Sequence, residues 1–184
     1  MKRLIQLIYI ISLTISLISC SNQADRAPDI TGYVVEKSEQ NILVSSVIPE
    51  DLSGNGGVSE FYQMIWFSNA PKELNYGDKV DIWHKELHES YPARSTIEHY
   101  TICESDSPEG AKMTESEVLE QVLSQKDIQP SELYAVRSTY FNKNKQTWII
   151  TLVEIWTEEV VTIEYSETDH LQSNSSNYMN LTSS

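Results

Sequence analysis

Positively charged residues are scarce in this sequence. The 184 residues contain 13 Lys and Arg against 27 Asp and Glu, which gives a formal net charge of −14. An acidic surface of this kind repels phosphate backbones and anionic lipid head groups. We therefore exclude nucleic acid as a partner and expect only weak, unspecific attraction for cations or basic peptides.

Recognisable catalytic motifs are also lacking. The sequence has no Gly-x-Ser-x-Gly, no phosphate-binding loop, no calcium-loop spacing and no cysteine beside a histidine motif. Its carboxylates are numerous but scattered. We expect no catalytic residues, no cofactor and no enzymatic activity.

Three histidines form the strongest candidate metal site. His84 and His88 are four residues apart, and His99 is close in sequence. Two histidines at this spacing on a helix could share a zinc ion. However, the segment leaves an expected strand and runs towards Pro92, so we predict no metal site. A metal-dependent enzyme using these three histidines remains the second alternative function.

Long apolar runs are absent except at the start of the chain. Lys2 and Arg3 precede the apolar segment 4–18, and Ser19 and Cys20 follow it, which is the pattern of a secretory signal peptide. Leu17-Ile18-Ser19-Cys20 resembles the lipobox of bacterial lipoproteins. The resemblance implies that residues 1–19 are removed and that Cys20 is lipidated. It also implies a membrane-anchored protein facing the extracytoplasmic side, whose formal charge falls to −16 when Lys2 and Arg3 leave.

Cysteine is therefore limited to Cys103 in the mature chain, which excludes an internal disulfide. Cys103 ends the strand-like run 96–103. We interpret it as a small buried residue rather than a reactive thiol.

Polar segments divide the chain. Residues 20–29 are expected to form the lipidated cysteine and a spacer, and residues 166–184 a disordered polar tail. Six turn-forming residues at 105–110 separate two predicted domains, 30–107 and 108–165. We expect the two domains to fold independently.

The first domain has the pattern of a small β-barrel. Residues 31–35, 42–44, 79–83 and 96–103 form strand-like runs, whereas 61–67 is ambiguous between helix and strand. This number of short strands favours an OB-like or SH3-like barrel.

Aromatic residues are dense in this domain, and most of them are expected in its core. A sharper hypothesis places Tyr62, Trp66 and Trp83 in a ligand groove beside the glycine-rich loop 54–57.

The second domain has a helical start. Thr114 and Glu117 match a capping box, and the apolar spacing predicts a helix to about Gln125. Runs 133–141, 147–156 and 160–165 predict a three-stranded meander. The fold class is therefore mainly β with α+β, a barrel followed by a helix plus antiparallel sheet.

Residues 30–110 resemble the YobA-like lipoproteins of Gram-positive bacteria. The resemblance rests on Ile30-Thr31-Gly32-Tyr33-Val34-Val35, Gly56-Gly57-Val58-Ser59-Glu60-Phe61-Tyr62, Ile65-Trp66-Phe67-Ser68-Asn69-Ala70-Pro71, Gly77-Asp78-Lys79-Val80, Glu89-Ser90-Tyr91-Pro92 and Pro108-Glu109-Gly110-Ala111. It implies a compartment and no activity.

Residues 113–165 are similar in order and pattern to half of a PepSY module. This similarity implies a peptidase-restraining role as the first alternative function. Our preferred expectation is a non-catalytic binding or interaction module, with the membrane and an extracytoplasmic protein or peptide as partners.

Overall fold

The computed structural model describes residues 26–105, 107–125 and 132–167. The predicted signal peptide, Cys20, residues 168–184 of the predicted tail and His170 lie outside the described residues. Within those ranges, no helix has the length and apolarity that a membrane span requires.

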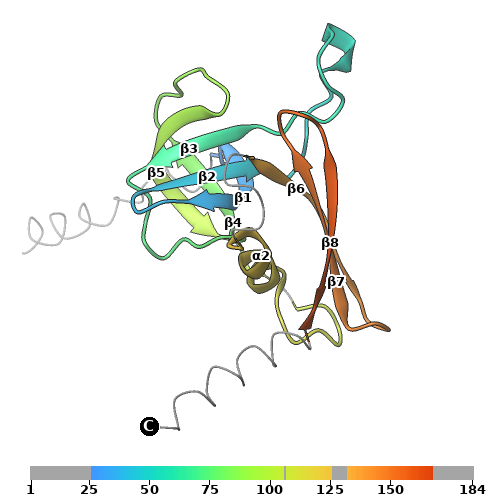
Figure 1. The fold of residues 1–184 in the computed structure, drawn as a ribbon. Helices are drawn as coiled ribbons and strands as arrows, with labels where there is room; N and C mark the ends of the chain where they lie inside the picture. Colours follow the sequence, from blue (N-terminus) through green and yellow to red (C-terminus); the bar gives the residue numbers. More distant parts are fainter. Residues whose placement is uncertain (1–25, 106, 126–131, 168–184) are drawn as a thin grey trace, which may run out of the picture.

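The first part of the chain is a closed five-stranded barrel (Figure 1). Around the barrel the strand order is β1-β2-β3-β5-β4, with antiparallel pairing except between β3 and β5, which run parallel. The predicted small β-barrel is confirmed, and the order with one parallel pair is that of an OB-like barrel. The strands are β1 (Ile30–Lys37), β2 (Asn41–Ser46), β3 (Met64–Ser68), β4 (Lys79–His84) and β5 (Ala93–Ile102).

Alternating side chains fill the barrel interior, since successive residues of a strand point to opposite faces. On β4, Val80 and Ile82 are fully buried, while Lys79 and Asp81 are only partly covered. Leu74, in the connection before β4, is also fully buried in this cluster. The other buried members are Ile30, Val34, Ile42, Val44, Ile65, Phe67 and Ala93.

The ambiguous segment 61–67 is resolved as a strand that begins at Met64. A long loop leads into it from β2. The loop contains a short 3-10 turn at Ser53–Asn55 and closes through backbone pairing of Glu50 with Phe61.

The second part is one helix and a meander, as predicted. Helix α2 (Glu115–Leu123) begins with the predicted capping box, in which the Thr114 hydroxyl accepts from the Glu117 amide. The helix ends at Leu123, two residues before the predicted end. Strands β6 (Tyr134–Asn142), β7 (Thr147–Glu154) and β8 (Val160–Ser166) form an antiparallel sheet in that order.

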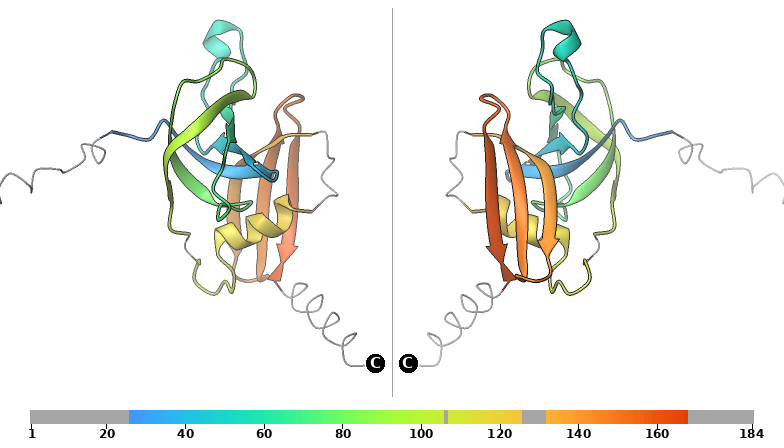
Figure 2. Two further views of the ribbon diagram at one scale, coloured as in Figure 1. Left: turned by 90° about the vertical axis from the view of Figure 1, so that its left-hand side faces the viewer. Right: turned by 90° about the vertical axis from the view of Figure 1, so that its right-hand side faces the viewer.

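Helix α2 lies beside the barrel and covers the same face of the three-stranded sheet, and β1 and β2 of the barrel contact β6 directly (Figure 2). A single hydrophobic cluster, which we call the shared core, joins all three elements. Leu43 and Met64 contribute from the barrel, Leu119 from α2, and Trp148 and Ile150 from β7. Because this core crosses the predicted boundary at residue 107, it argues against independent folding of the two halves.

Both predicted flexible ends need correction. Ser166 belongs to β8, and Glu167 is only 3% exposed, so these first two residues of the predicted tail are part of the folded structure. The Glu167 carboxylate accepts hydrogen bonds from the Met113 amide at 3.1 Å and from Trp148 Nε1 at 3.0 Å. At the other end, the Asp29 amide donates to the Ile82 carbonyl, so the predicted spacer 20–29 is already attached to β4 at its last residues.

Candidate functional site

A cavity of about 1050 Å³ opens on the barrel wall. Its lining comes from the β1–β2 turn, from β3, from the β4–β5 connection and from β5. The lining residues are Ser38, Asn41, Trp66, Ser68, Lys85, Glu86, His88, Arg94, Ser95, Thr96 and Glu98.

The parallel pairing of β3 with β5 brings two rows of outward-facing residues together. Trp66 is aligned with Arg94, and Ser68 with Thr96. The hydroxyl oxygens of Ser68 and Thr96 lie 3.2 Å apart. Asn41 of β2 is aligned with Ser68 on the other side. The cavity lining therefore combines an indole and a guanidinium from aligned positions with a row of hydroxyl and amide groups.

The β4–β5 connection folds back onto β5 and forms one rim of the cavity. The His88 amide donates to the Arg94 carbonyl at 2.8 Å, and the Arg94 amide donates to the His88 carbonyl at 3.2 Å. The buried Ser95 hydroxyl donates to the carbonyls of Lys85 and Glu86 at 3.3 and 3.1 Å. These bonds fix the backbone that carries the rim side chains.

Charged groups of both signs surround the opening. Lys85 and Arg94 are cationic, Glu86 and Glu98 are anionic, and all four are exposed. The ion pairs among the described residues join other groups: Arg26 with Asp29, Arg137 with Glu60, and Lys143 with Glu109. The cavity charges are therefore not neutralised by an ion pair within the described ranges and can contact a ligand.

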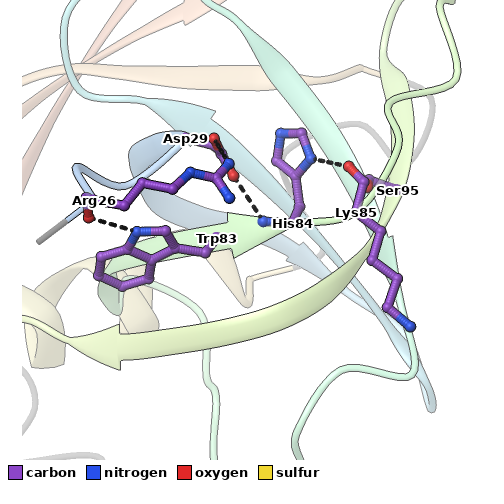
Figure 3. Close-up of polar contacts among 6 residues, drawn as sticks. All are labelled: Arg26, Asp29, Trp83, His84, Lys85 and Ser95. Carbon is purple, nitrogen blue, oxygen red and sulfur yellow. Dashed lines mark hydrogen bonds and ion pairs between the residues drawn. The ribbon is translucent and has the colours of Figure 1, made fainter. Parts of the chain in front are cut away.

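The predicted groove residues do not come together. Trp66 lines the cavity, but Tyr62 is 3% exposed and belongs to the shared core. Trp83 lies elsewhere on β4, where its Nε1 donates to the Arg26 carbonyl at 2.8 Å (Figure 3). The Trp83 ring also lies 5.1 Å from the ring of His99. The loop 54–57 contributes no lining residue. The described residues therefore do not bring Tyr62, Trp66 and Trp83 together beside this loop, and only Trp66 lines the cavity.

The three histidines occupy separate surroundings. His84 Nδ1 lies 2.6 Å from the Lys85 carbonyl oxygen, His88 lines the cavity, and His99 packs against Trp83. In the part of the chain that the structure describes, no group of three or more His, Cys, Asp or Glu is arranged to hold a metal ion. The metal-dependent alternative gains no support from this arrangement.

Asp29 attaches the start of the described chain to β4 (Figure 3). Its carboxylate accepts from the His84 amide at 2.9 Å and pairs with the Arg26 guanidinium. Burial opposes ionisation of Asp29, but these two partners outweigh it and lower the pKa of the carboxyl below its ordinary value. We assign Arg26, Asp29 and Trp83 a structural role, because their hydrogen bonds join the start of the described chain to β4.

Cys103 is partly buried and makes no disulfide among the described residues. Burial and the nearby Asp81 carboxylate raise the pKa of its thiol. A raised pKa disfavours the thiolate, so Cys103 lacks the activation of a nucleophile.

Comparison with known proteins gives a match for the barrel alone. Residues 31–104 match the model of a family described as protein of unknown function, DUF3221. The matched range runs from β1 to just beyond β5 and is therefore the barrel itself. No curated protein and no solved structure matches the chain.

Proposed function

We propose that this protein is a membrane-anchored extracytoplasmic lipoprotein whose barrel binds a ligand without transforming it. The cavity carries the proposal. Its volume of about 1050 Å³ is slightly above the usual range of small-molecule sites, which leaves room for a ligand of several rings. It lies between the β1–β2 turn and the β4–β5 connection, and OB-folds bind oligonucleotides and oligosaccharides between the corresponding loops.

The two serines of the cavity lack a neighbouring base among the described residues, which favours binding over catalysis in our proposal. A serine nucleophile needs a base within hydrogen-bond reach. The Ser68 hydroxyl contacts Thr96 and the Ser95 carbonyl, and the Ser95 hydroxyl contacts only backbone carbonyls. Within the described residues, neither serine is bonded to His88 or to a carboxylate.

The anchor is supported by the N-terminal sequence and by the YobA-like resemblance. Two acyl chains on Cys20 would give stable attachment. Labelling of cells with a tagged fatty acid tests this directly, with Cys20→Ala as the comparison. If the wild type and Cys20→Ala are labelled equally, or if the wild type is not labelled at all, Cys20 is not the anchor.

The helix and meander offer less support for the peptidase-restraining alternative. Val118 and Leu119 of α2, with Trp148 and Ile150 of β7, are all buried in the shared core. These residues are therefore already packed against the barrel and are not available to a peptidase.

A cavity-filling variant tests the binding function. Ser68→Tyr places a ring in the cavity, whereas Thr162→Tyr adds the same ring at an exposed position of β8. Purified protein would be titrated with saccharides, peptides and single-stranded DNA, followed by calorimetry. We expect one class to bind, to be recovered unchanged, and to lose affinity only with Ser68→Tyr. If no class binds, or if both variants behave alike, the cavity is not a binding site.

A further inference from the structure

We propose that the ligand of this cavity is a saccharide that carries a carboxylate, with Arg94 as the residue that selects for the acid. The proposal rests on the binding function above and names the chemistry of the ligand. Three features of the lining support it: the indole, the guanidinium beside it and the groups that surround them.

Trp66 supplies a flat apolar surface inside a polar cavity. Its side chain is half-buried and packs against the shared core, which holds the indole in place. The face of an aromatic ring is electron-rich. It therefore attracts the slightly positive C–H groups of a sugar ring while the sugar hydroxyls remain free to make hydrogen bonds.

Arg94 lies next to this surface because β3 and β5 are paired in parallel at Trp66 and Arg94. Its backbone is held on both sides, by β3 and by His88. Its guanidinium is exposed and makes no ion pair with the described acids. A guanidinium offers a planar fork of N–H donors that fits a carboxylate. A ring on Trp66 would thus bring its carboxylate substituent to Arg94, with Lys85 at the rim.

The remaining groups require a ligand that also donates hydrogen bonds. Asn41, Ser68 and Thr96 both donate and accept, whereas ionised Glu86 and Glu98 only accept. Sugar hydroxyls can serve all five groups. A phosphodiester chain offers mainly acceptors and would meet two carboxylates in the cavity.

Overall charge further restricts the ligand. The chain carries a formal charge of −14, so a polyanion is repelled before it reaches the cavity. Two cations and two carboxylates balance locally at the opening. A neutral sugar with a single carboxylate fits both conditions better than single-stranded nucleic acid, which carries a negative charge on every nucleotide.

The experiment compares acids with their own methyl esters. Galacturonate, glucuronate and an amino sugar with a lactyl ether, each with one carboxylate, would be titrated as the acid and as the methyl ester. Esterification removes the charge and keeps the ring. We expect at least one acid to bind the wild type about tenfold more tightly than its ester.

Arg94→Gln is the decisive variant, with Lys145→Gln as its control. Both remove one exposed positive charge, but Lys145 lies outside the cavity lining. We expect Arg94→Gln to weaken binding of the acid by roughly 10- to 100-fold and to leave the ester unchanged. Lys145→Gln should match the wild type for both. Circular dichroism and melting temperature check that the variants are folded.

Other outcomes separate the two proposals. Equal binding of acid and ester, unaffected by Arg94→Gln but abolished by Ser68→Tyr, would overturn the ligand class and keep the binding function. Preferential binding of an acidic peptide or of single-stranded DNA in the cavity would do the same. If no probe binds, or if Ser68→Tyr weakens the binding of none of them, the binding function itself is overturned.

Discussion

Gly77 provides a direct test of how the barrel meets α2. It precedes β4 with φ at +79°, and its amide donates to the Val34 carbonyl at 2.8 Å. A Cβ at this position would lie 2.6 Å from both Leu119 Cβ and the Ser116 carbonyl oxygen. The barrel therefore touches the backbone of the helix at a point where no side chain fits.

The expected cost of Gly77→Ala has two parts. An L-residue at positive φ costs roughly 1–2 kcal/mol. Forcing a methyl group into a packed contact adds roughly 1–3 kcal/mol. Gly56 isolates the first part, because its φ is also +79° but a Cβ there would meet nothing within 4 Å. We therefore expect Gly77→Ala to lower the free energy of unfolding by about 1–3 kcal/mol more than Gly56→Ala does.

Urea unfolding followed by tryptophan fluorescence measures both variants. Trp148 lies in the shared core and reports on it. Equal destabilisation by the two substitutions, within about 0.5 kcal/mol, would refute the close contact between the barrel and α2. It would also weaken the argument that the two parts share one core.

Three further predictions concern buried acids and the histidines. Glu167→Ala leaves the buried Trp148 Nε1 and the Met113 amide without their acceptor, so it should lower the free energy of unfolding in urea by about 2–4 kcal/mol. Glu164→Ala, on the exposed side of β8, serves as the control and should change this free energy little. Burial raises the pKa of Glu154, but hydrogen bonds from Thr157 and Trp156 outweigh it and hold that pKa below its ordinary value of 4.5. The wild type should therefore be more stable than Glu154→Gln, with the full difference in free energy of unfolding above pH 4.5 and a smaller one as the pH falls through the lowered pKa. A difference that does not change with pH would contradict this explanation. Micromolar zinc should leave the melting temperature of the chelator-treated protein unchanged, and a rise of several degrees that His84→Ala abolishes would reinstate the metal-dependent alternative.

Local patterns predicted most of the fold. The alternation in Lys79-Val80-Asp81-Ile82 predicted β4, and the spacing of Thr114 and Glu117 predicted the start of α2. Each pattern depends on neighbours in sequence, so it can be read without tertiary structure. Segment 61–67 stayed ambiguous, because a short apolar run has no period that distinguishes a strand from a helix.

The cavity could not be predicted in the same way. Arg94 and Thr96 alternate with buried neighbours as in any half-exposed strand, and nothing local indicates that Trp66 and Ser68 are their partners. Parallel pairing joins residues almost thirty positions apart, and only the closed barrel determines its register. Tyr62 was assigned to a groove from its residue type alone, whereas the shared core buries it.

The second half of the chain determines which part of the barrel surface stays uncovered. Tyr33, Leu43 and Met64 face outwards from the barrel, yet they are buried in the shared core with α2 and β7. Part of the β2–β3 face that other OB-folds use for ligands is therefore already occupied. Trp66 stands where this cover ends, since its neighbour on β2 is Leu43 of the shared core and its neighbour on β5 is Arg94 of the cavity. The ligand that we propose would thus be confined to the β3–β5 side, where Trp66 and Arg94 are aligned, and this restriction favours a short charged sugar over a long strand laid across the barrel.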